Sequence, residues 1–231
     1  RNYDGEVAQG GYSQQIVVSE RFVLRVPDSI PLEQAAPLLC AGITMYTPLK
    51  RWGAGPGKSV GIIGMGGLGH MGVKIAAAMG ADVTVISQTM SKEADGREFG
   101  AVDYRATAES TVYKDLRGTF DLIVCTVSSE LPLDKYLGMV KPFGALVLVG
   151  LPPEPQQLAV WSLIGGDKVL TGSNIGGIPI TQEMLDFCAK HQIAATVETI
   201  SADQVAEAYD RVVDSKVRYR FVIDTSTIVP E

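Results

Sequence analysis

The sequence predicts an α/β fold built on a doubly wound parallel sheet. Short apolar segments rich in β-branched residues alternate with helical segments through the middle of the chain, and four of them are expected strands: Ser59–Ile63, Asp82–Ser87, 120–127 and 145–150. The last two are predominantly apolar, which is typical of strands buried on both faces. Because strands and helices alternate strictly, the connections should be right-handed crossovers between parallel strands.

Composition limits the possible classes of protein. The 231 residues are 46% hydrophobic and 20% charged, enough for one large domain, or for one domain plus pieces of a second. A net charge of -6 argues against a nucleic-acid partner, and no apolar run reaches the roughly 20 residues that span a membrane. The start has no signal-peptide pattern, and the three cysteines are widely spaced, so we expect a cytoplasmic protein.

The segments before the first of these strands are less regular. Polar and apolar residues alternate over 11–26, which predicts another β-strand, and Pro27 with Asp28 and Ser29 predicts a turn after it. A helix is expected from Pro31 to residue 50, interrupted at Pro37 and at Pro48.

Between and after the four strands, the pattern predicts further helices. They are expected over 70–79, ended by Gly80, and over 92–100, 181–191 and 201–214. A short strand at 196–200 should lie between the last two helices, and a closing strand at 218–224.

A glycine-rich loop is the strongest local signal. Gly64-Met65-Gly66-Gly67-Leu68-Gly69 follows a predicted strand and precedes a predicted helix. The first glycine permits a tight turn, the second lets the backbone approach a pyrophosphate, and the third allows close packing of helix on sheet. Free N–H groups at the helix start would face the phosphates. A purely structural turn does not explain this spacing, so we expect a Rossmann-type nicotinamide-cofactor domain.

The end of the second strand indicates which cofactor. A site for NAD(H) usually has an acidic residue there, which binds the ribose 2′-hydroxyl. Here the chain carries Ser87, Gln88, Thr89, Met90, Ser91 and Lys92. These hydroxyl and amide groups, with one cation and no acid, favour the 2′-phosphate of NADP(H). The alternative is a polar surface loop with a solvated Lys92.

Several motifs then resemble one known family. PLLCAGITMY at 37–46, GMGGLGHMGVK at 64–74, GSNIGGI at 172–178 followed by TQEMLDFC, and RYRFVID at 218–224 occur in the order seen in zinc-dependent medium-chain dehydrogenases. The chain resembles their cinnamyl alcohol dehydrogenase branch and its bacterial NADP-dependent relatives. The resemblance implies a Rossmann NADP-binding domain at 37–177. It also implies that 1–36 is a remnant of a GroES-like, β-rich catalytic domain, and that 178–231 returns to that domain.

The resemblance also implies an activity: reversible hydride transfer between a small primary alcohol and NADP, with a zinc ion polarising the substrate oxygen. Cys40 matches a zinc ligand, and Thr44 matches a residue near the nicotinamide. The matching cofactor-contacting positions are Gly64, Met65, Gly66, Gly67, Leu68 and Gly69, then Ser87, Gln88, Thr89, Ser91 and Lys92, and then Thr126, Gly150, Ser173, Asn174 and Ile175.

One departure from the family is large. Its other two catalytic zinc ligands, its structural-zinc cysteines and its proton relay belong to a region upstream of Arg1. Since catalytic zinc needs three protein ligands, we expect a fragment that binds cofactor without turnover. Two alternatives stay open: a zinc-independent quinone or enoyl reductase of the same superfamily, against which Cys40 argues, and a non-catalytic NADP-binding module.

Other candidate residues have simpler interpretations. We expect Cys125 and Cys188 to be inert core residues, Asp121 to lie at a surface or turn before its strand, and His191 to cap a helix end. His70 is expected to have a structural role at its helix start. Arg218 and Arg220 are within possible reach of a phosphate but are expected to face solvent. An open sheet edge and the apolar stretch 174–180 predict a homodimer.

Overall fold

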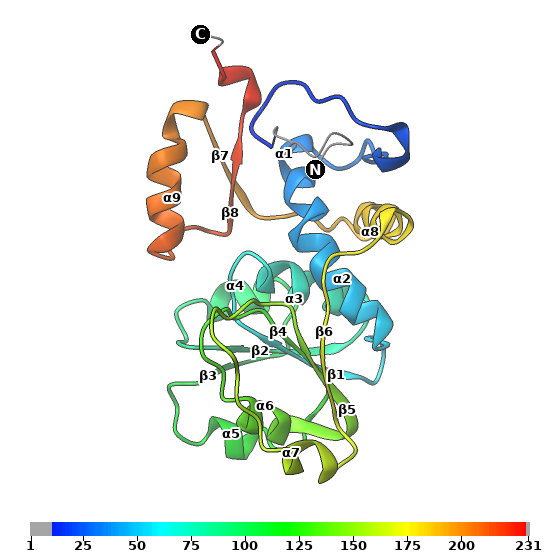
Figure 1. Cartoon of the computed structure of the whole chain (residues 1–231), viewed down its shortest axis with the longest axis vertical. Coiled ribbons are helices and arrows are strands. Elements are labelled where there is room, and N and C mark those ends of the chain that lie inside the picture. Colours follow the sequence, from blue (N-terminus) through cyan, green and yellow to red (C-terminus); the bar gives the residue numbers. More distant parts are fainter. Residues whose placement is uncertain (1–10, 230–231) are drawn as a thin grey trace.

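The computed structural model describes residues 11–229 and contains the predicted parallel sheet. Its six strands lie in the order β3-β2-β1-β4-β5-β6, all parallel (Figure 1). They are β1 Ser59–Ile63, β2 Asp82–Ser87, β3 Asp103–Ala106, β4 Phe120–Cys125, β5 Val140–Leu148 and β6 Val169–Gly172. This order reverses direction between β1 and β4, which is where a doubly wound sheet leaves a crevice for a ligand.

Both faces of the sheet are covered by helices. These include α3 Gly69–Ala78, α4 Glu93–Glu98, α5 Val112–Asp115, α6 Leu133–Met139 and α7 Trp161–Ile164. Successive strand residues point to opposite faces, so the fully buried neighbours Ile62 and Ile63 belong to separate core clusters. The double coverage explains why the central strands are predominantly apolar.

A helical segment leads into the sheet as predicted, with one correction. It comprises α1 Leu32–Ala35, a 3-10 helix η2 Ala36–Leu39 and α2 Ala41–Arg51. The predicted interruption at Pro37 is confirmed, but the one at Pro48 is wrong, because α2 continues through it. Pro48 is a buried residue of α2. The packing of α2 against α3 and α8 (Ile178–Lys190) compensates for the missing helical hydrogen bond.

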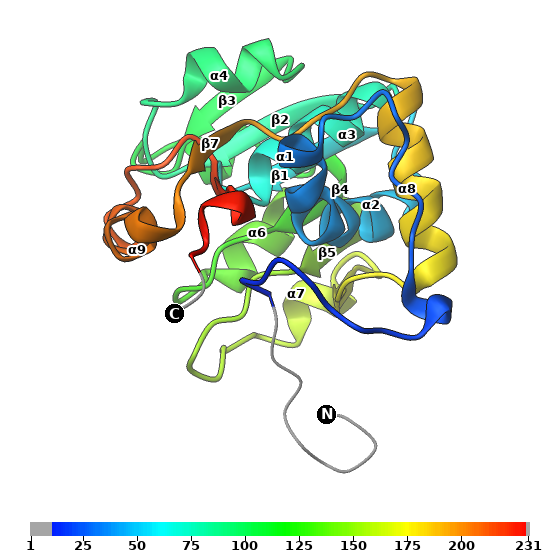
Figure 2. The ribbon, with the colours of Figure 1, turned by 90° about the horizontal axis from the view of Figure 1, so that it is seen from above.

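The predicted strand at 11–26 is wrong. The segment contains only a 3-10 helix, η1 Glu20–Phe22, and Val17 is fully exposed. No described strand lies beside it to pair with its backbone, and alternation alone does not make a strand without a partner. It is fixed instead to α8, beside which it runs in Figure 2. The Arg25 backbone N–H donates to Gln182 Oε1 at 2.9 Å, and Gln182 Nε2 donates to the Arg25 carbonyl at 2.9 Å.

The C-terminal part of the described chain forms a small unit apart from the six-stranded sheet (Figure 1). Strands β7 Val197–Ile200 and β8 Arg220–Ile223 pair in parallel, joined by η3 Ala202–Gln204 and α9 Val205–Val213, with η4 Thr225–Thr227 after them. The predicted strands and helices of this region are confirmed. In the described part of the chain, no helix is long and apolar enough to cross a membrane.

Candidate functional site

The glycine loop connects β1 to α3 in a tightly packed turn. Gly64 has φ +94°, a conformation that glycine adopts freely, and its N–H donates to the Ile86 carbonyl at 2.8 Å. A side chain on Gly69 would collide with the Gly64 carbonyl, so only glycine allows α3 to start this close to the sheet. Gly66, in contrast, has open space where a Cβ would be. The loop therefore leaves room for a ligand at the start of α3.

Other predicted cofactor positions lie, like the loop, at the carboxyl ends of the parallel strands. Thr126 follows β4, and its hydroxyl donates to the Ile63 carbonyl at 2.9 Å at the end of β1. Gly150 follows β5 closely packed against the Val127 carbonyl. Ser173 follows β6, and its N–H donates to the Leu148 carbonyl at 3.0 Å. The next two residues, Asn174 and Ile175, are exposed and joined by a bond from the Ile175 N–H to Asn174 Oδ1 at 2.8 Å.

Lys92 connects the end of β2 to the glycine loop. Its Nζ donates to the Met65 carbonyl at 2.9 Å and lies 5.2 Å from the centre of the Tyr219 ring. Burial lowers the pKa of the Lys92 ammonium, and the nearby Arg218 lowers it further. Lys92 is therefore held at the loop and is not a freely solvated surface residue. Within the preceding segment, the Thr89 and Ser91 hydroxyl oxygens are 2.9 Å apart.

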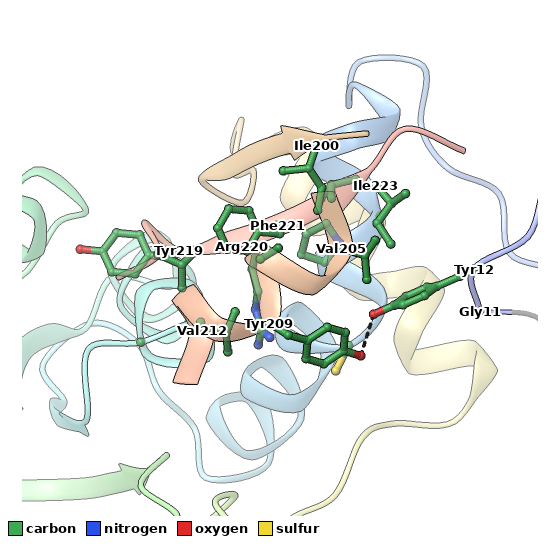
Figure 3. A pocket seen from close by; sticks show the side chains of 18 of the residues that line it. Gly11, Tyr12, Ile200, Val205, Tyr209, Val212, Tyr219, Arg220, Phe221 and Ile223 are labelled. Atoms are coloured by element: carbon green, nitrogen blue, oxygen red, sulfur yellow. Dashed lines mark hydrogen bonds between the residues drawn. The ribbon is translucent and has the colours of Figure 1, made fainter. Parts of the chain in front are cut away.

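A cavity of about 620 Å³ opens beside the glycine loop (Figure 3). One wall contains Gly66, Gly67, Lys92 and Cys40, and the other comes from β8 and α9. The cavity thus brings together the predicted loop, the predicted 2′-phosphate cation and the predicted metal ligand. The other predicted cofactor positions lie outside its lining: Gly64, Met65, Leu68, Gly69, Ser87, Gln88, Thr89, Ser91, Thr126, Gly150 and 173–175. Thr44 also lies outside it, almost wholly buried in α2, where its N–H donates to the Cys40 carbonyl at 3.0 Å.

Arg220 is the most informative residue of the opposite wall. Its side chain extends from β8 into the cavity in Figure 3, and its guanidinium lies where a Cβ on Gly67 would be. Its Nε is buried and has no hydrogen-bond partner among the residues that the structure describes. Burial lowers the pKa of Arg220, although the nearby Cys40 opposes the shift. The expectation that Arg220 faces solvent is wrong, and its unpaired donor beside the loop fits an anion.

Arg218, two residues earlier, has a different environment. Its side chain is half exposed, and its Nε lies 3.4 Å from Asp95 on α4. The alternation of RYRFVID indicates that Arg218 and Arg220 share a face of the strand, but only the fold reveals what covers each of them.

Cys40 is the one predicted metal ligand in the chain. It is exposed at the cavity, whereas Cys125 and Cys188 are buried. Burial raises the pKa of Cys125 to about 11 and that of Cys188 to about 12, which suits the inert role predicted for both. Over residues 11–229, no group of three His, Cys, Asp or Glu side chains is placed to hold a metal. Since catalytic zinc needs three protein ligands, the described residues do not complete a zinc site.

His70 lies behind the loop, not in the cavity. It is fully buried: its Nδ1 lies 3.3 Å from the Gly66 carbonyl, and the Thr196 N–H donates to its Nε2 at 3.3 Å. Burial, together with Lys74, lowers the pKa of His70 to about 3, so the ring is neutral. These contacts support the structural role predicted for it.

Two further residues test the simpler interpretations. His191 is the C-cap residue of α8, as predicted, and its ring centre lies 4.4 Å from that of Phe187. The expectation that Asp121 lies at a surface or turn before its strand is wrong, because it lies inside β4 and within the strand predicted over 120–127. Its carboxylate accepts the Ser59 N–H at 2.9 Å and pairs with Lys141 at 2.8 Å. A strand position was compatible with this acid because these donors neutralise it.

Comparisons with known proteins agree with this geometry. The profile of the family described as zinc-binding dehydrogenase matches residues 67–190. The chain is 56% identical over 225 residues to NADP-dependent alcohol dehydrogenase C 1 of Mycolicibacterium smegmatis, covering 97% of this chain and 64% of that protein. It is 49% identical to mannitol dehydrogenase of Petroselinum crispum, covering 99% of this chain and 68% of that relative.

A solved structure is similar to this chain in fold as well as in sequence. A protein described as CAD from Helicobacter pylori, in a crystal structure described as complexed with NADP(H), superposes with a TM-score of 0.90 at 39% identity. The superposition covers 98% of this chain and 65% of that one, so the chain spans about two thirds of the length of the proteins it matches. A family profile that matches more than half of the residues, with close relatives and a matching fold, shows that the chain belongs to the zinc-binding dehydrogenase family.

Proposed function

We propose that this chain binds NADP(H) and forms the cofactor-binding part of an alcohol dehydrogenase that interconverts small primary alcohols and aldehydes. The observation that carries the proposal is the cavity in which the glycine loop, Lys92 and Arg220 meet. The loop offers backbone N–H groups at the start of a ten-residue helix, and two cations lie within the same cavity. The phosphate groups of a dinucleotide could therefore accept hydrogen bonds from the loop N–H groups and pair with the two cations.

Arg220 and the loop would hold the pyrophosphate. The unpaired Nε of Arg220 lies beside Gly67, and a phosphate oxygen there would accept its hydrogen. Charge-assisted bonds from guanidinium to phosphate are among the strongest in proteins. This contact is shared by NADPH and NADH, so it supports dinucleotide binding without favouring either.

Lys92 would select NADP(H) over NAD(H). The segment Ser87, Gln88, Thr89 and Ser91 offers hydroxyl and amide groups at the end of β2, and Lys92 adds a positive charge fixed by its bond to Met65. No acidic side chain stands at 87–92 to repel a 2′-phosphate. The names of the relatives, which include NADP-dependent alcohol dehydrogenases, support this choice.

The remaining predicted sites concern the reacting end of the cofactor. We assign Thr44, Thr126, Gly150 and 173–175 to the nicotinamide half, since the last three follow the ends of β4, β5 and β6. Cys40 is proposed as one zinc ligand, and at least two more would have to come from outside the described residues. Bound zinc would supply Lewis-acid polarisation of the substrate oxygen. We therefore assign cofactor binding, and no turnover, to residues 11–229 by themselves.

The domain organisation and assembly follow from the same proposal. We assign 37–177 to the cofactor domain, and 1–36 and 178–231 to the catalytic domain. A homodimer would form through the open edge of β6 and residues 174–180, where Ile175 is 56% exposed and Trp161 of the preceding helix is 74% exposed. Cys40, Cys125 and Cys188 are all free thiols, which supports a cytoplasmic location.

The cofactor proposal is tested by calorimetric titration of the chain with NADPH and, separately, with NADH. Tighter binding of NADPH is the expected result. Equal affinities would contradict the role of residues 87–92, and binding of neither would contradict the proposed function. The zinc proposal is tested on the whole gene product, comparing zinc content and dehydrogenase activity between the wild type and Cys40→Ala. A zinc content unchanged by the substitution would remove Cys40 from the metal site.

A further inference from the structure

We propose that Arg218 is a second cation for the 2′-phosphate of NADP(H), held by Asp95 until the cofactor binds. With Lys92 it would determine cofactor specificity. This inference rests on the proposed function, because it assigns a residue to the same cofactor.

The first observation is that Arg218 and Lys92 flank one aromatic ring. The Lys92 ammonium lies 5.2 Å from the centre of the Tyr219 ring, and the Arg218 guanidinium carbon lies 5.8 Å from it. The two charges are close enough for Arg218 to lower the pKa of Lys92, an effect second only to burial. Two cations thus lie around one ring although 126 positions of sequence separate residues 92 and 218.

The second observation is that this point adjoins the end of β2. Tyr104 of β3 donates from its hydroxyl to the Thr89 carbonyl at 3.3 Å, and it packs on the backbone of Gly96 in α4. Burial raises the pKa of Tyr104, and both Ser87 and Arg218 interact with it. Arg218 is therefore near Tyr104, the residue whose hydroxyl contacts the short segment that is expected to receive the 2′-phosphate.

The third observation concerns the acids of α4. Asp95 is 3.4 Å from Arg218 and also accepts a hydrogen bond from the Tyr219 hydroxyl. Glu93 is paired with Arg97 at 2.9 Å. If Arg218 turned from Asp95 to a phosphate, Asp95 would keep the tyrosine as a partner. The exchange therefore leaves no carboxylate without a hydrogen bond.

The charge of the ligand explains why a second cation is useful. A phosphate monoester carries about -1.5 to -2 at neutral pH. Lys92 alone offsets part of that charge and already donates one of its hydrogens to Met65. Arginine adds a planar pair of donors that matches two phosphate oxygens. Since the Arg218 side chain is half exposed, it has room to turn from Asp95 toward a ligand.

The test is Arg218→Gln, titrated with NADPH, NADH and adenosine 2′-monophosphate. NADPH and adenosine 2′-monophosphate should bind about 10-fold more weakly, while NADH binding stays unchanged, since one charge-assisted bond is lost. Arg218→Lys should recover part of the loss. Arg97→Gln is the matched control, because Arg97 is equally exposed and pairs with Glu93 of the same helix. An NADPH to NADH affinity ratio unchanged in Arg218→Gln would overturn the inference.

A second variant tests the holding role of Asp95 and serves if Arg218→Gln does not fold. Asp95→Asn keeps a hydrogen-bond acceptor for Tyr219 and removes the charge that competes for Arg218. NADPH should then bind about 3-fold more tightly or better, at unchanged NADH affinity, because the exposed charge pair that competes for Arg218 is removed. Unchanged or weaker NADPH binding would overturn the holding role. If wild-type protein binds NADPH selectively and both variants keep that selectivity, this inference alone fails. If wild type binds neither cofactor, the proposed function itself fails.

Discussion

His70 and Tyr219 stack with their ring centres 4.9 Å apart and their planes 11° from parallel. The stack joins the first turn of α3, directly behind the glycine loop, to the residue that precedes β8. Phe99 packs on both rings edge-on, and Lys74 lies over the Phe99 ring at 4.4 Å. The loop and the C-terminal unit are therefore held together by buried aromatic contacts as well as by the bond from Thr196 to His70.

The neutral state of His70 predicts a pH-dependent stability. Its pKa is about 3 in the fold, against about 6.5 in an unfolded chain. Between these values the unfolded state binds a proton that the folded state does not, so stability is complete above about pH 6.5 and falls as the pH falls. The loss approaches about 1.4 kcal/mol per pH unit. Urea unfolding of wild type at pH 7.5, 6 and 5, compared with His70→Gln, measures it.

The comparison isolates His70 because carboxylates contribute equally to both proteins. His70→Gln should be less stable at pH 7.5 but should lose less stability on acidification. Parallel curves for the two proteins would mean that His70 is not kept neutral by the fold.

Gly66→Ala and Gly69→Ala form a pair with opposite expectations. A methyl group on Gly69 would collide with the Gly64 carbonyl, and its free energy of unfolding should fall by about 3 kcal/mol or more. A methyl group on Gly66 meets nothing, so stability should change by less than about 1 kcal/mol. NADPH binding should nevertheless weaken at least 10-fold in Gly66→Ala, since the methyl fills the space proposed for the pyrophosphate. Thermal unfolding and calorimetry separate the two effects, and unchanged affinity in Gly66→Ala would place the pyrophosphate elsewhere.

Arg220→Gln should weaken NADPH and NADH to the same degree, by about 10-fold. The unpaired Nε contributes no hydrogen bond to the fold, so the melting temperature should stay the same or rise slightly. The measurement is titration of both cofactors with the variant. A loss confined to NADPH would move Arg220 from the pyrophosphate to the 2′-phosphate.

Oligomeric state is predicted from the open edge of β6. Wild-type protein should sediment as a dimer at micromolar concentration, and Ile175→Asp should shift it to monomer, because a charge would be buried in the interface. Val102→Asp is the control: Val102 is 58% exposed, close to the 56% of Ile175, but it lies beside β3 at the opposite edge of the sheet. A monomeric wild type would contradict the proposed dimer.

Local patterns predicted the parts of the fold that local chemistry determines. Strands Ser59–Ile63 and Asp82–Ser87 have the predicted bounds, because a glycine or a polar turn follows each apolar run. The four-residue strands β3 and β6 are too short to show a period. The alternation at 11–26 is genuine, but a strand needs a neighbour, which the sequence does not show.

The site was predictable to a similar extent. Its phosphate loop is a contiguous motif, so residues 64–69 could be identified directly. The environment of Arg220 could not, because its burial depends on how β8 packs against a loop more than 150 positions earlier in the sequence. The predicted helix interruption at Pro48 was wrong for the same reason: packing of α2 against α3 and α8 outweighs the helix-breaking preference of proline.

The bond from Lys92 to the Met65 carbonyl bears on any attempt to change cofactor preference by grafting a segment. The lysine is held by the phosphate loop and lies against a tyrosine from the far end of the chain. Transplanting residues 87–92 into another dehydrogenase would carry over the charge without the contacts that position it. A successful exchange would have to move three separate stretches together: the loop, the turn after β2 and the segment that leads from Tyr219 into β8.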